Sequence, residues 1–113
     1  TDSFEIDQKP LIKALLDGIA AREAPERLAF AFHSAVAQAT AAVAAGICRD
    51  RGLSVVALSG GVFMNRSLLQ LTRRELETCG LTVLVPHTVP VNDGCIAYGQ
   101  AAIARARLAR SKA

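Results

Sequence analysis

The chain has 113 residues, a formal net charge of +3 and 51% apolar residues, a composition that excludes a disordered protein. Its length permits one domain with a modest core. Only 4% of the residues are aromatic and none is tryptophan, so aromatic side chains that could stack on the bases of single-stranded nucleic acid are nearly absent. The basic residues near the end suit a helix C-terminus, and no nucleic-acid partner is expected; they are Arg105, Arg107, Arg110 and Lys112.

The three cysteines, Cys48, Cys79 and Cys95, form an odd set without a C-x-x-C pair. This pattern argues against a disulfide framework and against a zinc ribbon. We therefore expect a reducing, cytoplasmic location and inert, buried thiols. No apolar run is expected to reach membrane-spanning length, and the chain does not open with a signal peptide.

The first half of the chain is predicted to be helical. Residues 1–9 are polar and are expected to form a tail or the end of a preceding segment, after which Pro10 suits the first turn of a short helix. Pro25 begins a second helix, which has apolar residues at helical spacing and ends near Arg51, with Gly52 as a left-handed cap. Residues 1–52 thus form a helical lead-in to the rest of a single partial domain, 1–113.

Residues 53–113 are predicted to form a strand–helix–strand–helix unit. The strands are 53–59 and 81–85, the helix between them is 65–79, and the last helix begins at Asp93 or Gly94 and ends near Arg107. Pro90 lies in the loop 86–92 before it. The two strands are apolar at nearly every position, which is typical of parallel strands covered on both faces. Two strands are too few for such a sheet, so we expect the C-terminal portion of a larger α/β protein, or self-association through the sheet edges.

The first strand ends in Ser59, Gly60 and Gly61, and a helical pattern follows Asn65. A strand, a glycine turn and a helix can present free backbone amides and the positive end of a helix to a phosphate. Asn65 is then placed to bind a sugar or a base. A tight connection without a ligand would leave the same pattern. The spacing matches neither the dinucleotide fingerprint nor a P-loop.

A second motif covers residues 89–101 and contains Asn92, Asp93 and Gly94. The carboxyl group of Asp93 can cap the following helix, hold a divalent metal or act as a general base. Capping is the first choice from chemistry alone. The small residues that follow, such as Gly99, favour close packing of this helix against its neighbours.

The two motifs together, Ser-Gly-Gly-Val-Phe-x-Asn and Asn-Asp-Gly-x-Ile-Ala-x-Gly-Gln-Ala, resemble the C-terminus of the HypF-type carbamoyltransferases of nickel–iron hydrogenase maturation. The likeness covers nearly the whole chain, including the segment 27–33. More distantly, the chain is similar to the tRNA threonylcarbamoyl-transferases. Both families have the actin-like ATPase (RNase H-like) fold, so the resemblance implies an α/β lobe with helices flanking a parallel βαβ unit.

The resemblance implies that carbamoyl phosphate and ATP give a carbamoyl-adenylate, from which the carbamoyl group passes to the C-terminal cysteine of a HypE-like acceptor. Ser59, Gly60 and Gly61 would lie at the nucleotide phosphates and Asn65 near the ribose or adenine. Asp93 would match the acidic ligand of a divalent metal whose histidine ligands lie upstream of this chain. His33 lies near the apolar stripe of its helix, so a packed core histidine is preferred to a metal ligand, and His87, which follows a strand, is expected to be solvated. The chain alone is expected to be inactive.

Two other functions stay open. The same fold could serve tRNA threonylcarbamoylation or a sugar kinase, for which a basic face with phosphate contacts would be expected. Alternatively, the chain could be a helical interaction module without a ligand, in which small replacements of Gly60 and Gly61 would have no effect.

Overall fold

The computed structural model describes residues 5–89 and 91–111, so Thr1 to Phe4, Pro90, Lys112 and Ala113 lie outside the described residues. The chain forms the helices α1 (Lys9–Ala20), α2 (Pro25–Arg51), α3 (Arg66–Thr78) and α4 (Gly94–Ser111), with a 3₁₀ helix η1 (Gly61–Met64) before α3. The strands are β1 (Val55–Ala57) and β2 (Thr82–Leu84). The predicted order of elements is confirmed; each strand is shorter than predicted, η1 was not foreseen, and α4 extends beyond Arg107.

Local sequence explains where the helices begin and end. Pro25 lies in the first turn of α2, where the missing amide hydrogen has no partner to lose. Gly52 ends this helix in the left-handed conformation, at φ 64°, and its amide donates to the last turn. Gly80 follows α3 with φ 78°. The predicted cap and stop at these two glycines are confirmed.

The strands β1 and β2 are parallel neighbours, with Val55 opposite Thr82 and Ala57 opposite Leu84. Helix α3 connects them, which confirms the predicted βαβ unit. One face of the sheet packs against α2 and α3, where Ala41, Leu58 and Leu76 form a buried cluster.

The other face of the sheet is open. Val55 is 48% exposed and Leu84 is 54% exposed, so the prediction that both faces are covered is wrong for the described residues. The apolar pattern indicates strands that are suited to burial. Among the described residues, however, no element covers the second face of the sheet.

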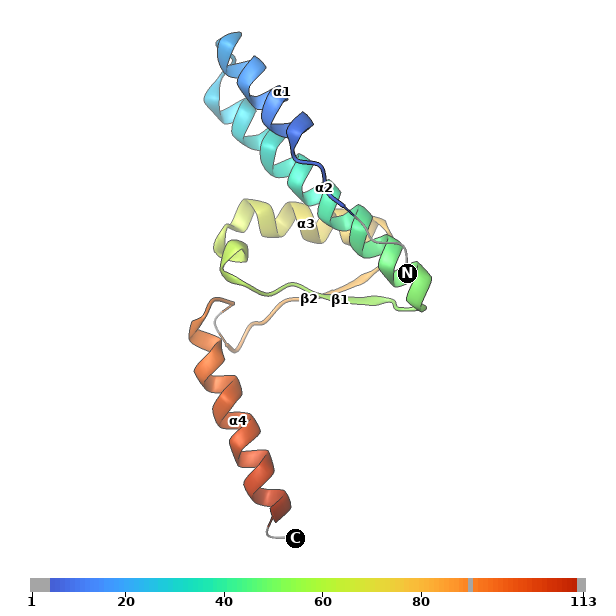
Figure 1. The fold of residues 1–113 in the computed structure, drawn as a ribbon, viewed down its shortest axis with the longest axis vertical. Helices are drawn as coiled ribbons and strands as arrows, with labels where there is room; N and C mark the ends of the chain where they lie inside the picture. The colour runs from blue at the N-terminus through green and yellow to red at the C-terminus, as the bar shows by residue number, and fades with distance from the viewer. Residues whose placement is uncertain (1–4, 90, 112–113) are drawn as a thin grey trace.

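The molecule is elongated, with a radius of gyration of 18.4 Å. A compact domain of this length would have a radius of gyration of about 13 Å. The pair α1–α2 extends from one end of the sheet, and α4 extends from the other (Figure 1). A Cβ atom added to Gly99 would meet nothing within 4 Å, so the close packing expected for α4 is absent within the described residues.

Helix α2 is long enough and apolar enough to cross a membrane, judged by length and composition alone. The expectation that no segment reaches this length is therefore wrong. Core helices of water-soluble proteins meet the same criterion, and α2 packs against α1 and α3.

Candidate functional site

The glycine turn lies where β1 passes into α3. Gly60 has φ 109° and ψ 155°, a backbone conformation that is open almost only to glycine. Gly61 begins η1, which ends at Met64, and Asn65 lies between η1 and α3 as the capping residue of both. The predicted strand, glycine turn and helix are thus present, with one 3₁₀ turn inserted between glycines and helix.

The structure joins the two sequence motifs directly. The amide of Gly60 donates to the carbonyl oxygen of Val91, at 2.7 Å. The Asn92 side chain donates to Met64 Sδ at 3.5 Å, and a Cβ atom placed on Gly61 would lie 4.0 Å from Asn92 Cβ. Residues some thirty positions apart therefore form one continuous surface around the turn.

This contact changes the expected phosphate cradle. The Gly60 amide is occupied by Val91, so the prediction that both glycine amides are free is wrong for Gly60. The amides of Gly61 and Val62 open η1 and have no acceptor within that helix. An anion at this turn would therefore meet Gly61 and Val62 first.

Asn65 has two hydrogen-bonding partners within the protein. Its Oδ1 accepts from the amide of Leu68 at 3.1 Å, so Asn65 is the side-chain cap of α3. Its Nδ2 lies 2.8 Å from Nε2 of His33 on α2. An amide side chain offers two N–H donors and two acceptor positions, so one donor and one acceptor position remain for a sugar or a base.

His33 is the site residue that sequence reasoning missed. It was assigned to core packing because it lies near the apolar stripe of its helix, and it is half-buried. Its Nε2 nevertheless faces Asn65, and its Nδ1 faces the carbonyl oxygen of Ala29 at 2.7 Å. The sequence did contain a signal for this role, because His33 is a polar ring on the long helix that is expected to pack against the βαβ unit.

Asp93 does not cap α4. The amide of Gly94 donates to Asn92 Oδ1 at 3.0 Å, and that of Cys95 to the Asn92 carbonyl oxygen. The Asp93 carboxylate is exposed and has no hydrogen bond or ion pair within the described residues. The first choice made from the sequence, capping by Asp93, is therefore wrong, and Asn92 performs that task.

Among the described residues, no group of three histidine, cysteine or acidic side chains could hold a metal ion. The Asp93 carboxylate suits one ligand position of a divalent cation. Both nitrogens of His33 have protein partners, and His87 is exposed in the loop after β2. A metal at Asp93 would need its remaining ligands from outside these residues.

The other predicted positions contribute less to the site. Ser59 is exposed, and its hydroxyl has no partner in the described part of the chain. The cysteines are free thiols: Cys48 is buried, Cys95 is half-buried and Cys79 is exposed. Exposure of Cys79 contradicts the expectation that all three thiols are buried.

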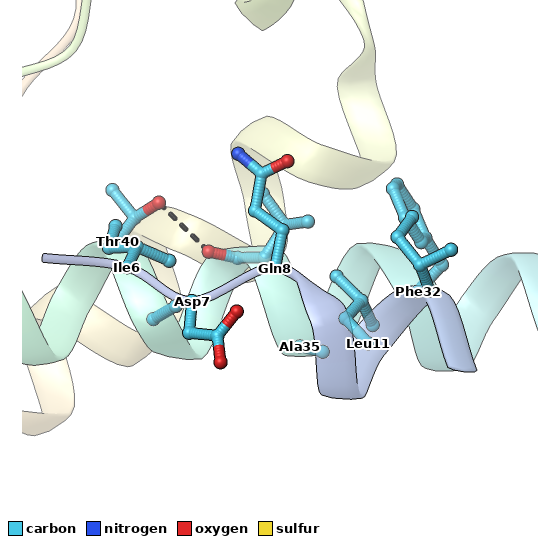
Figure 2. Close-up of a pocket in the computed structure, with 10 residues that line it drawn as sticks. Ile6, Asp7, Gln8, Leu11, Phe32, Ala35 and Thr40 are labelled. Carbon is cyan, nitrogen blue, oxygen red and sulfur yellow. Dashed lines mark hydrogen bonds between the residues drawn. The ribbon is translucent and has the colours of Figure 1, made fainter. Parts of the chain in front are cut away.

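An apolar hollow of about 330 Å³ lies between the start of α1 and the middle of α2 (Figure 2). Ile6, Leu11 and Phe32 line it, and the Thr40 hydroxyl beside it donates to the Val36 carbonyl. It contains no residue of either motif, so we do not assign it to the site.

Comparison with known proteins decides the family. The family profile described as "Carbamoyltransferase, Kae1-like Domain, second subdomain" matches residues 1–100. This chain belongs to the HypF carbamoyltransferase family. It is 42% identical to the carbamoyltransferase HypF of Rhodobacter capsulatus over 103 residues, and this alignment covers 91% of the chain and 13% of that protein. It is 35% identical over 95 residues to the Synechocystis HypF, covering 84% of the chain and 12% of that protein.

A solved HypF structure has the same fold. The crystal structure of T. kodakarensis HypF superposes with a TM-score of 0.74 and 34% identity over 85% of this chain. That match covers 12% of the T. kodakarensis chain. The HypF subdomain described here therefore spans about an eighth of the relatives that it matches.

Proposed function

We propose that this subdomain forms one wall of the nucleotide site of a HypF carbamoyltransferase. In the proposed reaction, water cleaves carbamoyl phosphate to carbamate and phosphate. A carbamate oxygen then attacks the α-phosphorus of ATP and expels pyrophosphate, which gives carbamoyl-adenylate. The cysteine thiolate of a HypE-like acceptor attacks the carbamoyl carbon, and AMP leaves.

The observation that carries this proposal is the hydrogen bond between Gly60 and Val91. It places the glycine turn, with the open amides of Gly61 and Val62, beside the loop that carries Asp93. Backbone amides at the start of a helix suit nucleotide phosphates. A carboxylate without a partner among residues 5–89 and 91–111 suits a cation that would accompany those phosphates.

The residues of this chain would bind and orient. Gly61, which lacks a Cβ, would let a phosphate approach the main chain. The unused donor and acceptor of Asn65 would hold a ribose hydroxyl or the base. A divalent metal bound at Asp93 would neutralise phosphate charge, and its other ligands would come from elsewhere.

The wider setting is proposed from the family alone. A HypE-like acceptor, a role in hydrogenase maturation and a cytoplasmic location fit the free thiols of the chain and the thiol chemistry of the reaction. Transfer to a protein thiol requires the acceptor cysteine to be reduced.

The test uses a chimera, defined as Rhodobacter capsulatus HypF in which this chain replaces the matching segment. The chimera should bind ATP and release AMP when carbamoyl phosphate and a HypE acceptor are supplied. ATP-dependent amide shifts should fall on Gly61, Val62, Asn65 and Asp93. A folded chimera that transfers carbamoyl groups without shifts at the glycine turn would sink the assignment of the nucleotide to this wall.

A further inference from the structure

The strongest unexplained feature is a chain of hydrogen bonds from α2 to the start of α3. It begins at the carbonyl oxygen of Ala29, passes through the His33 ring to the Asn65 amide, and ends at the amide of Leu68. His33 and Asn65 are 32 positions apart in the chain. The contact joins α2 to Asn65, the residue that caps the start of α3 beside the glycine turn.

Only one placement of the hydrogen atoms gives every donor in this series of hydrogen bonds an acceptor. The Ala29 oxygen can only accept, so His33 Nδ1 carries a proton. The Leu68 amide can only donate, so Asn65 presents Oδ1 to it and turns Nδ2 toward the ring. His33 Nε2 must then accept, which requires the neutral imidazole. The opposite amide orientation would set Nδ2 against the Leu68 N–H group.

Asn65 is also tied to the turn through its backbone. Its amide donates to the Val62 carbonyl at 3.2 Å, and its carbonyl accepts from Leu69 at 3.0 Å. A change in the Asn65 side chain is therefore passed to η1 on one side and to α3 on the other. The His33 imidazole can hold this junction because α2 packs along α3, which brings the His33 side chain to Asn65.

We propose that His33 is a positioning residue, whose neutral Nδ1-protonated ring holds Asn65 in the orientation that caps α3 and sets the glycine turn. As far as it concerns the nucleotide, this inference rests on the proposed function. The hydrogen-bond arrangement itself does not depend on any ligand. Its tests therefore separate the two.

The first test reads the tautomer of His33 by nitrogen NMR of the imidazole in the 113-residue chain. His87, an exposed ring without a partner in the described part of the chain, is the internal reference. We expect a protonated Nδ1 and an unprotonated, accepting Nε2. In Asn65→Asp, the new carboxylate keeps the cap but can only accept, so Nε2 loses its donor and the His33 nitrogen signals should change. In Asn65→Ser, which also keeps a good cap, the His33 signals should move toward those of His87.

The second test measures ATP affinity in the chimera. His33→Phe keeps a ring of similar shape, and His87→Phe is the matched control. Loss of one neutral hydrogen bond should weaken ATP binding about threefold to tenfold in His33→Phe, with no change in His87→Phe. Because His33 acts through Asn65, the double variant His33→Phe/Asn65→Ser should be no weaker than Asn65→Ser alone.

The positioning role would be overturned if the His33 nitrogen signals stayed unchanged in both Asn65 variants. It would also be overturned if the losses of ATP affinity were additive in the double variant. A chimera without any ATP affinity would instead contradict the proposed function. In that case the imidazole signals of the chain still decide the inference.

Discussion

The amide nitrogen of Gly60 lies 2.7 Å from the carbonyl oxygen of Val91. This bond joins the turn after β1 to the loop after β2, which is how the ends of two parallel strands come to share one surface. It also fixes Gly60 in its unusual backbone conformation, at φ 109°. The neighbouring Gly61 does not have a positive φ, and its amide, at the start of η1, has no acceptor within that helix.

The two glycines should therefore respond differently to the same substitution. Gly60→Ala should lower the free energy of unfolding by about 1–3 kcal/mol, because alanine is strained at this φ and ψ. Gly61→Ala should change stability by less than about 0.5 kcal/mol, because its Cβ meets only Asn92 Cβ, at 4.0 Å. Urea unfolding of the two variants measures this difference.

The Gly61 variant also tests the ligand. If a phosphate approaches this glycine, Gly61→Ala in the chimera should weaken ATP binding although the fold is intact, and Gly61→Val should weaken it further. Unchanged ATP affinity in a stable Gly61→Val chimera would favour a glycine turn that only connects β1 to α3.

Asp93→Ala in the chimera should reduce carbamoyl transfer about a hundredfold or more, since a misplaced reactant costs about that much. Hydrolysis of carbamoyl phosphate should remain largely intact, because the hydrolytic step proposed above uses neither ATP nor the metal proposed at Asp93. Asp50→Ala, at an exposed carboxylate near the end of α2, is the matched control. Equal loss of both activities in Asp93→Ala would indicate misfolding and would leave no specific role for the carboxylate.

The start of α4 offers a prediction about stability alone. Asn92→Ala removes the side-chain acceptor of the Gly94 amide and should weaken the first turn by about 1 kcal/mol. Asp93→Ala should leave that turn unchanged, because the carboxylate makes no bond to it. Amide exchange of Gly94, Cys95 and Ile96 reads the difference, and fraying in Asp93→Ala alone would return the cap to Asp93.

The four helices and the order of the two strands were predictable from the sequence because each depends on local signals, whereas η1 was not predicted. Prolines at the starts of helices, Gly52 and Gly80 at their ends, and apolar runs for the strands are all short-range features. The site was predictable only in part. Asp93 and Asn92 are adjacent, and residue type alone favours either as a cap; the path of the loop against Gly61 decides between them. His33 was missed because its role depends on how α2 packs against α3.

The buried core is small enough that a single side chain should decide its stability. Leu76 is 0% exposed and packs in the cluster with Ala41 and Leu58. Leu76→Ala removes buried methyl groups and leaves a cavity, which costs about 2–5 kcal/mol. Small domains are stable by about 5–15 kcal/mol, so this loss should remove a large share of the stability and lower the melting temperature. Ile103→Ala on α4 is the control, because Ile103 is 56% exposed. Thermal unfolding followed by circular dichroism compares the two, and equal melting temperatures would contradict the placement of the core between α2, α3 and the sheet.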